Sequence, residues 1–325
     1  MKLALIGYGS VARALSRLLE QKGRDFPFRI TGIHTWRHGT AIDPGGLRPD
    51  PPFGPRAASI DEFLDRAGAE IAVELTTLNP SAGEPAISHI RAAFARGMHV
   101  VTANKGPIAH AYADLCAEAA SAGVVFRFES AVMDGAPVFN LWRHTMPGVK
   151  LLGFTGVLNS TSKIVIETME SGGSFEEGLA AARALGVTEA DGAFDVEGWD
   201  SAAKTAALAN VLMGARTTPQ QVSTRGITRL TPERLAEINR LGKTVRLVSR
   251  ARRKGGGITL RVRAEVLDRT DLLACTTGTS NLILFHTDLM GTFGTVSLAP
   301  QVEQTAYGVF SDLVEIVRFG SGAGA

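Results

Sequence analysis

The chain has 325 residues, a formal net charge of +2, 45% hydrophobic residues and 20% charged residues. At about 100–200 residues per domain, this length predicts two domains or one large one, and the composition argues against disorder of the whole chain. A net charge this small argues against partners such as nucleic acid or an acidic membrane surface. We expect a cytoplasmic protein with two reduced thiols, because Cys116 and Cys275 match no metal or redox spacing and no signal peptide or membrane span is recognisable.

The first 128 or so residues alternate short apolar runs with amphipathic runs. The apolar runs predict strands at 3–6, 29–35, 71–75, 99–102 and 124–128. The amphipathic runs predict helices at 11–20, 60–67, 84–96 and 107–122, with a Pro/Gly-rich loop at 38–55. Continuous apolar strands separated by helices indicate a Rossmann-type, doubly wound parallel α/β sheet, whose ligands bind at the carboxyl ends of the strands.

The pattern changes after about Asp134. Helical stretches at 161–170, 175–185 and 199–213 precede strand-like runs at 244–248, 258–266, 281–286 and 295–298. That order predicts a second, α+β domain. A final amphipathic helix at 303–319 could fold back on the first domain.

A glycine-rich turn stands between the first strand and the first helix. Gly7-x-Gly9-x-x-Ala12, with Ser10 and Val11 inside it, is the spacing of a dinucleotide-binding turn. Gly7 allows the tight turn, Gly9 lets a pyrophosphate approach the backbone, and Ala12 lets helix and strand pack closely. The alternative is a turn without a ligand. Strand, helix and position at the N-terminus agree with the cofactor interpretation.

The end of the second strand indicates which cofactor binds. An acidic residue is expected there for NAD, to hold the ribose 2′-hydroxyl. None lies between Asp25 and Asp43, and the segment carries Arg37, which could pair with a 2′-phosphate. The sequence therefore favours NADP(H) over NAD(H). The alternative for Arg37 is a solvated surface arginine.

Two further segments carry chemistry. The fourth strand ends in Asn104-Lys105, where an ammonium could stabilise negative charge on a carbonyl oxygen during hydride transfer. A glycine-broken acidic loop, 186–198, then leads into a helix with Asp200 and Lys204 four residues apart, on one helix face. The carboxylate could position the lysine, and the acids could bind the ammonium group of an amino acid. A surface salt bridge is the alternative for this pair.

On these motifs the chain resembles homoserine dehydrogenase over nearly its whole length. The matching segments are the glycine turn, His99–Lys105 with Asn104, Gly156–Thr161, and most specifically the acidic loop ending in Asp200-x-x-x-Lys204. The resemblance implies reversible, NAD(P)-dependent interconversion of L-homoserine and L-aspartate 4-semialdehyde, in threonine, methionine and isoleucine biosynthesis. It also implies a homodimer formed through the sheet of the second domain.

The resemblance implies roles residue by residue. Lys105 and Lys204 match the catalytic lysines. Substrate binding is implied for Glu189, Asp195, Asp200, Asn159, Ser160 and Thr161. Cofactor contacts are implied for Gly7, Gly9, Ser10, Val11, Ala12, Arg37, Thr76, Thr102, Asn104 and Lys105. A structural monovalent cation, Na⁺, is implied at Glu129, Val132, Asp134 and Ala136.

The resemblance also sets domain boundaries and leaves alternatives. It implies a dinucleotide-binding domain at 1–134, a substrate-binding catalytic domain at 135–302, and a returning helix within 303–325. The sequence departs from the family pattern at Ser160, Gly192 and the 299–303 segment, where the family has Gly, Pro and a glycine-rich turn. A related amino-acid dehydrogenase with another substrate, and a non-catalytic NADPH-binding sensor, remain open. No residues are left for an amino-acid-sensing domain, so feedback by threonine through one is not expected.

Overall fold

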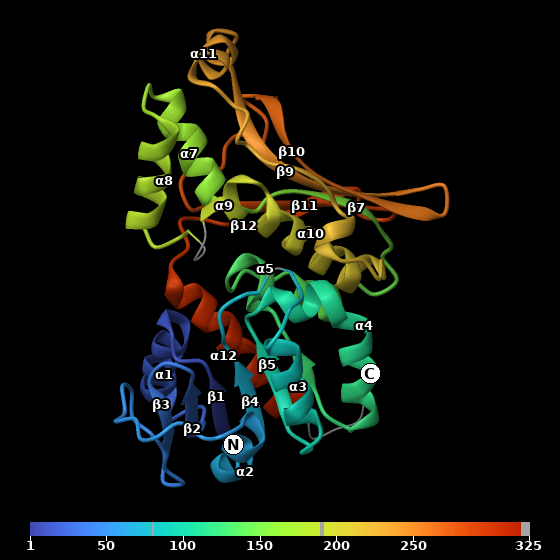
Figure 1. The fold of residues 1–325 in the computed structure, drawn as a ribbon. Coiled ribbons are helices and arrows are strands. Elements are labelled where there is room, and N and C mark those ends of the chain that lie inside the picture. Colours follow the sequence, from blue (N-terminus) through green and yellow to red (C-terminus); the bar gives the residue numbers. More distant parts are fainter. Residues whose placement is uncertain (80, 189–191, 320–325) are drawn as a thin grey trace. The chain divides into compact units, whose positions relative to one another are not determined.

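The computed structural model describes residues 1–79, 81–188 and 192–319, and the chain divides into two compact units. One unit is Met1–Phe139 together with the residues from Gln301 on, and the other is Asn140–Pro300. Each unit contains one six-stranded sheet (Figure 1). Among the described residues, no helix is long and apolar enough to cross a membrane.

The sheet of the first unit has the strand order β3-β2-β1-β4-β5-β6. All neighbouring pairs are parallel except β2 with β3. The strands are β1 (Lys2–Ile6), β2 (Arg29–Thr35), β3 (Gly39–Ile42), β4 (Ile71–Glu74), β5 (His99–Thr102) and β6 (Phe126–Arg127). The chain turns from one half of the sheet to the other between β1 and β4, so the expected doubly wound α/β fold is confirmed.

Helices cover this sheet. They are α1 (Ser10–Lys22), α2 (Ile60–Ala67), α3 (Ala86–Phe94), α4 (Lys105–Ser121), α5 (Ser130–Met133) and α12 (Val302–Phe319). The helix α1 buries Ala12, Leu15 and Leu19, three residues at helical spacing, and packs against α12 in the same hydrophobic core. The helices α2, α3 and α4 contact one another in sequence, and α2 and α3 also contact the sheet. Figure 1 shows α12, in red, beside α1 in this unit.

The second unit is built on a mixed sheet of order β12-β11-β7-β9-β10-β8. Its strands are β7 (Leu151–Val157), β8 (Ser223–Arg225), β9 (Lys243–Lys254), β10 (Gly257–Asp268), β11 (Asn281–Thr287) and β12 (Thr292–Ser297). Its helices are α7 (Ser160–Glu170), α8 (Phe175–Ala184), α9 (Gly192–Val196), α10 (Trp199–Met213) and α11 (Pro232–Arg240), with a 3₁₀ turn at Pro219–Gln221. The helix α6 (Phe139–Thr145) spans the boundary between the units in the chain.

Several segments differ from expectation. The loop expected at 38–55 contains β3, which forms because Gly39–Ile42 pairs with the edge of β2. The acidic loop contains the short helix α9. The strands β9 and β10 each extend to 12 residues, because they pair along their whole length as an antiparallel hairpin. The strand β7 was not anticipated, and it is ordered by β9 and β11 on its two sides.

The turn after β1 supplies a test of the glycine motif. Gly7 has a φ of +99°, and a Cβ there would lie 2.6 Å from the carbonyl oxygen of Leu75, whereas a Cβ at Gly9 would meet open space. Gly7→Ala is therefore expected to lower the free energy of unfolding by at least about 2 kcal/mol. Gly9→Ala is the matched control and costs under about 1 kcal/mol. Urea unfolding of both variants measures this, and equal losses would contradict the assignment.

Candidate functional site

The glycine turn presents backbone donors to open space. The N–H of Gly7 donates to the carbonyl of His34 at 2.8 Å, which ties the turn to the end of β2. Gly9 is the N-cap of α1, and no side chain caps this helix end. The first N–H groups of α1 and the positive end of its dipole are therefore available to an anion such as a pyrophosphate. This turn and the first residues of α1 contain five of the predicted cofactor contacts: Gly7, Gly9, Ser10, Val11 and Ala12.

The end of β2 carries basic and aromatic side chains. Arg37 lies exposed in the turn between β2 and β3. Beside it, the guanidinium carbon of Arg56 lies 3.8 Å from the centre of the Trp36 ring. Burial, with smaller effects of His89 and Arg56, lowers the pKa of His34. Asp50 forms an ion pair with Arg13. Sequence reasoning identified Arg37 and missed Arg56, whose position depends on the fold.

A buried carboxylate organises the carboxyl ends of β4 and β5. Glu74 is fully buried, and Thr102 donates to it at 2.9 Å while the backbone N–H and the hydroxyl of Thr76 also donate to it. Asn104 donates its backbone N–H to the Thr102 hydroxyl at 3.0 Å and its side-chain amide to the Thr76 carbonyl at 3.3 Å. The structure thus brings together Thr76, Thr102 and Asn104 through Glu74. An acid ending an apolar strand was the available signal for Glu74.

Lys105 is the first residue of α4. Its predecessor Asn104 caps this helix, with the side-chain oxygen accepting the N–H of Gly106 at 2.9 Å. The lysine side chain is half-buried. The cap therefore places an ammonium group at the carboxyl edge of the parallel sheet, where ligands of this fold bind.

The loop expected to hold a cation surrounds α5. Glu129 is buried, and its carboxylate accepts the N–H groups of Val138 and, at 3.0 Å, Phe139. Asp134 has a φ of +56° and accepts the Thr305 hydroxyl at 3.2 Å. Val132 and Ala136 lie in the same turn. Carboxylate and backbone carbonyl oxygens are hard donors, so the chemistry of this set fits a hard cation. No group of three or more His, Cys, Asp or Glu side chains suited to a metal occurs in the described parts of the chain.

In the second unit, one asparagine links two buried acids. Asn159 is the N-cap of α7, and its oxygen accepts the N–H of Ser162 at 2.7 Å. Its amide nitrogen donates to Asp195 at 2.6 Å and to Asp200 at 2.8 Å. The two aspartates are 1% and 3% exposed. Two carboxylates that would repel each other are therefore held at one amide.

Lys204 completes this cluster. Its ammonium nitrogen lies 3.1 Å from Asp200 and donates to the carbonyl of Leu158 at 2.6 Å. The side chains of Lys204 and Asp200 are 16% and 3% exposed. The pair is thus buried, and the alternative of a solvated surface salt bridge does not apply to it.

Glycines fold the acidic segment into this arrangement. Gly198 has a φ of +92° and joins α9 to α10, so that Asp195 precedes the turn and Asp200 follows it. A Cβ at Gly226 would lie 2.0 Å from the carbonyl oxygen of Val196. Only glycine at position 226 therefore allows the two backbone segments to approach this closely. Gly192 is the first residue of α9. Glu189 lies outside the described residues.

The start of α7 carries three further side chains. Ser160 donates to the carbonyl of Thr279 at 3.0 Å, and Thr161 to that of Val187 at 3.1 Å. Lys163, which sequence reasoning missed, is 1% exposed and donates to the carbonyl of Ser280. Burial lowers its pKa to about 7, with Glu167 opposing and Arg246 and Lys204 adding to the shift. Its signal was a lysine directly before the apolar run Ile164-Val165-Ile166.

The cluster of Asn159, Asp195, Asp200 and Lys204 is suited to a small amino acid. Buried carboxylates can bind an ammonium group, and a lysine beside them can exchange a proton with a hydroxyl or carbonyl oxygen. The first unit separately offers a turn that fits a dinucleotide.

Family models match both parts of the chain. A model described as "Homoserine dehydrogenase" matches residues 137–314, and one described as "Homoserine dehydrogenase, NAD binding domain" matches residues 7–129.

Full-length relatives agree. The chain is 35% identical to the NAD(+)-dependent homoserine dehydrogenase of Pseudomonas canavaninivorans, covering 97% of this chain and 96% of that protein. It is 34% identical to the homoserine dehydrogenase of Methanocaldococcus jannaschii, over 97% and 98%. It is also similar to the crystal structure of a putative homoserine dehydrogenase from Archaeoglobus fulgidus, with a TM-score of 0.83, 28% identity, and coverage of 97% and 99%.

The buried Lys163 gives a pH-dependent prediction. Its pKa is about 7 in the folded chain against 10.5 ordinarily, so between these values the unfolded chain binds more protons and the free energy of unfolding rises with pH. Lys163→Met removes this contribution. From pH 7 to pH 10 the wild type should therefore gain about 1–3 kcal/mol relative to the variant.

Urea unfolding at several pH values measures this difference. Lys254→Met, at an exposed position of the same unit, is the matched control and should leave the pH slope unchanged. Parallel pH curves for the wild type and Lys163→Met would show that Lys163 is not neutralised by burial.

Proposed function

The chain belongs to the homoserine dehydrogenase family, and we propose that it interconverts L-homoserine and L-aspartate 4-semialdehyde with a nicotinamide cofactor. The buried cluster of Asn159, Asp195, Asp200 and Lys204 carries this proposal. The reaction belongs to the biosynthesis of threonine, methionine and isoleucine. Neither Cys116 nor Cys275 forms a disulfide, which supports a reducing, cytosolic location.

In this proposal the aspartates bind the substrate and the lysine transfers a proton. Asp195 and Asp200 hold the ammonium group of the substrate. Lys204 moves the proton: in the oxidation its neutral amine takes the proton of the hydroxyl group, and in the reduction its ammonium returns a proton to that oxygen. A bound nicotinamide cofactor would accept or supply the hydride at the carbon that carries this oxygen. Asp200, 3.1 Å from the ammonium nitrogen, positions Lys204.

Lys105 is the second lysine of the reaction in this proposal. It stands at the carboxyl edge of β5, capped into place by Asn104. An ammonium group there stabilises negative charge as it develops on the substrate oxygen.

An absorbance assay at 340 nm tests the reaction. Purified protein is given L-homoserine with NAD⁺ or NADP⁺, and L-aspartate 4-semialdehyde with the reduced forms. Turnover in both directions is expected. Binding of NADPH without turnover of either compound would favour the non-catalytic sensor. Turnover of another amino alcohol in place of homoserine would favour the related dehydrogenase.

The lysines give a prediction with a matched control. Lys204→Ala and Lys105→Ala should each lower kcat by about 10²-fold or more, as for a lost acid–base or electrostatic group. Because Asp200 positions Lys204, the effect of Asp200→Asn on kcat should not add to that of Lys204→Ala. Lys243→Ala removes an exposed Lys–Asp pair of the same unit and should leave kcat near the wild-type value. Steady-state kinetics measure kcat for each variant. A near-normal kcat in Lys204→Ala would show that Lys204 takes no part in the mechanism.

We propose that NADP(H) is preferred over NAD(H). Support comes from the exposed Arg37 in the turn after β2 and from the absence of an acid between Asp25 and Asp43. The relative from Pseudomonas canavaninivorans carries the opposite preference in its name. Cofactor choice in this chain therefore needs its own measurement.

Arg37→Ala tests this preference. A guanidinium that reads the 2′-phosphate interacts with NADP(H) alone, so the variant should bind NADPH about tenfold or more weakly and NADH with unchanged affinity. Isothermal titration with each cofactor measures the difference. Equal weakening of both would show that Arg37 does not read the phosphate.

We also propose that the loop of Glu129, Val132, Asp134 and Ala136 holds Na⁺, through one carboxylate and backbone carbonyl oxygens. The buried carboxylate of Glu129 and the left-handed turn at Asp134 support this. Thermal unfolding in NaCl against tetramethylammonium chloride tests it, since a specific cation raises the midpoint with concentration.

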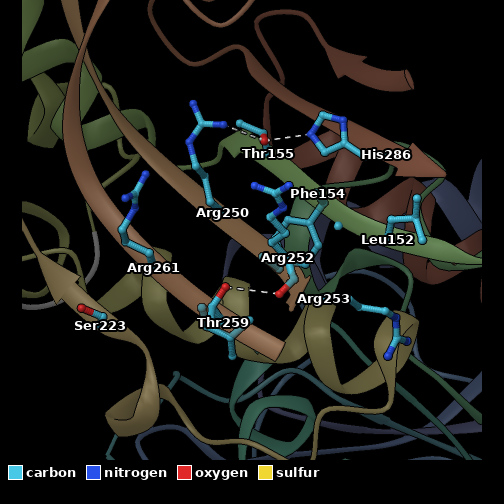
Figure 2. A pocket seen from close by; sticks show the side chains of 13 residues that line it. Leu152, Phe154, Thr155, Ser223, Arg250, Arg252, Arg253, Thr259, Arg261 and His286 are labelled. Atoms are coloured by element: carbon cyan, nitrogen blue, oxygen red, sulfur yellow. Dashed lines mark hydrogen bonds between the residues drawn. The ribbon is translucent and has the colours of Figure 1, made fainter. Parts of the chain in front are cut away.

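A homodimer through the second-unit sheet is the remaining proposal. A hollow of about 870 Å³ lies on this sheet. Figure 2 shows three of its lining residues, Arg250, Thr155 and His286, joined in a row by hydrogen bonds. Glu265 orders Arg250 further, with contacts of 2.7–3.1 Å. On β12, paired with β11, Val296 is 49% exposed. A pre-ordered polar patch with an apolar flank can meet its own copy across a two-fold axis. Light scattering of the purified protein tests the homodimer by measuring its molar mass.

A further inference from the structure

Trp36 is a large aromatic residue left open to solvent. It directly follows the last residue of β2, Thr35, and is 79% exposed. One face of its ring is covered by the guanidinium of Arg56, 3.8 Å from the ring centre. With one face covered and most of the side chain still accessible, the other face of the indole is available for stacking.

The backbone builds this arrangement. Gly39 has a φ of +98°, and a Cβ there would lie 2.1 Å from the carbonyl oxygen of Gly54. The missing side chain lets the segment around Gly54 lie against β3, where Gly54 and Thr40 exchange backbone hydrogen bonds of 2.9 and 3.3 Å. The hydroxyl of Thr40 accepts the N–H of Ala57 at 3.0 Å, which fixes the backbone next to Arg56. The hydrogen-bonded backbone at Gly54 and Ala57 therefore places Arg56 beside Trp36.

Trp36 also lies close to the glycine turn. Gly7 donates its N–H to His34, two residues before Trp36, so the turn and the end of β2 are adjacent. Aromatic contacts connect the same two places: the rings of Tyr8 and Phe53 are 5.9 Å apart, and those of Phe53 and His38 are also 5.9 Å apart. A dinucleotide with its pyrophosphate at Gly9 extends its adenosine half toward the end of β2.

We propose that Trp36 is the stacking platform for the adenine ring of the cofactor, with Arg56 backing the opposite face of the indole. This inference rests on the proposed function. Stacking of a base on an aromatic ring is worth about 1–3 kcal/mol and does not depend on the 2′ substituent. Trp36 thus contributes to affinity for NAD(H) and NADP(H) alike, whereas Arg37 contributes to the choice between them.

Fragment binding separates this role from catalysis. ADP-ribose and its 2′-phosphate are titrated calorimetrically into the wild type, Trp36→Ala and Trp36→Phe. Trp36→Ala should weaken both fragments by about 5–150-fold, the range that 1–3 kcal/mol corresponds to. Trp36→Phe should retain most of the affinity, because a phenyl ring still stacks. Arg37→Ala should weaken only the 2′-phosphorylated fragment.

Tryptophan fluorescence provides the second readout. The chain has three tryptophans, and Trp142 and Trp199 belong to the second unit. Stacking should quench emission when ADP-ribose binds the wild type or Trp142→Phe, and the quench should vanish in Trp36→Phe. Unchanged fragment affinity in Trp36→Ala, or a quench that survives Trp36→Phe, would overturn the stacking role while the dehydrogenase proposal stands. Failure of the wild type to bind NADPH, NADH or either fragment would overturn both.

Discussion

The second unit depends on how one amide satisfies two buried carboxylates. Asp195 and Asp200 are almost completely removed from solvent, and like charges in such surroundings repel strongly. The Asn159 nitrogen donates to both, and Lys204 adds a positive charge at Asp200. Removing any partner would leave a buried charge without compensation, which costs several kcal/mol. The cap of α7, the turn at Gly198 and the start of α10 all serve to hold this cluster.

The first unit uses a related device at the ends of its strands. Glu74 is fully buried, and the groups that compensate it are hydroxyls and a backbone N–H of Thr76 and Thr102. These bonds align the loops after β4 and β5, including the cap that positions Lys105. In the first unit a buried carboxylate orders the backbone that leads to Lys105, and in the second a buried carboxylate contacts Lys204 directly. Such groups gain little net stability, and their value lies in positioning.

The 299–303 segment contains a residue in a backbone conformation that glycine favours. The 299–303 segment lacks the glycine-rich turn, yet Ala299 has a φ of +43°, the left-handed region that glycine favours. Its N–H donates to the hydroxyl of Ser280 at 3.1 Å, which stabilises the turn despite the strain of the Cβ. The hydrogen bond of Lys163 to the Ser280 carbonyl anchors the same residue from the other side. Hydrogen bonds to Ser280 thus hold this segment where the sequence lacks a glycine.

The sequence by itself determined the features that depend on local spacing. The strand–glycine–helix pattern at Gly7, the four-residue interval from Asp200 to Lys204, and the alternation of the first unit are all readable without a fold, because each is set by backbone geometry over a few residues. Tertiary structure decided what depends on distant partners. The strand β3 exists only because the edge of β2 pairs with it, and Asn159 reaches Asp195 across 36 positions of the chain. Burial decided the rest: the Asp200–Lys204 spacing is equally that of a surface pair, and Lys163 has a lowered pKa mainly because the fold removes it from water.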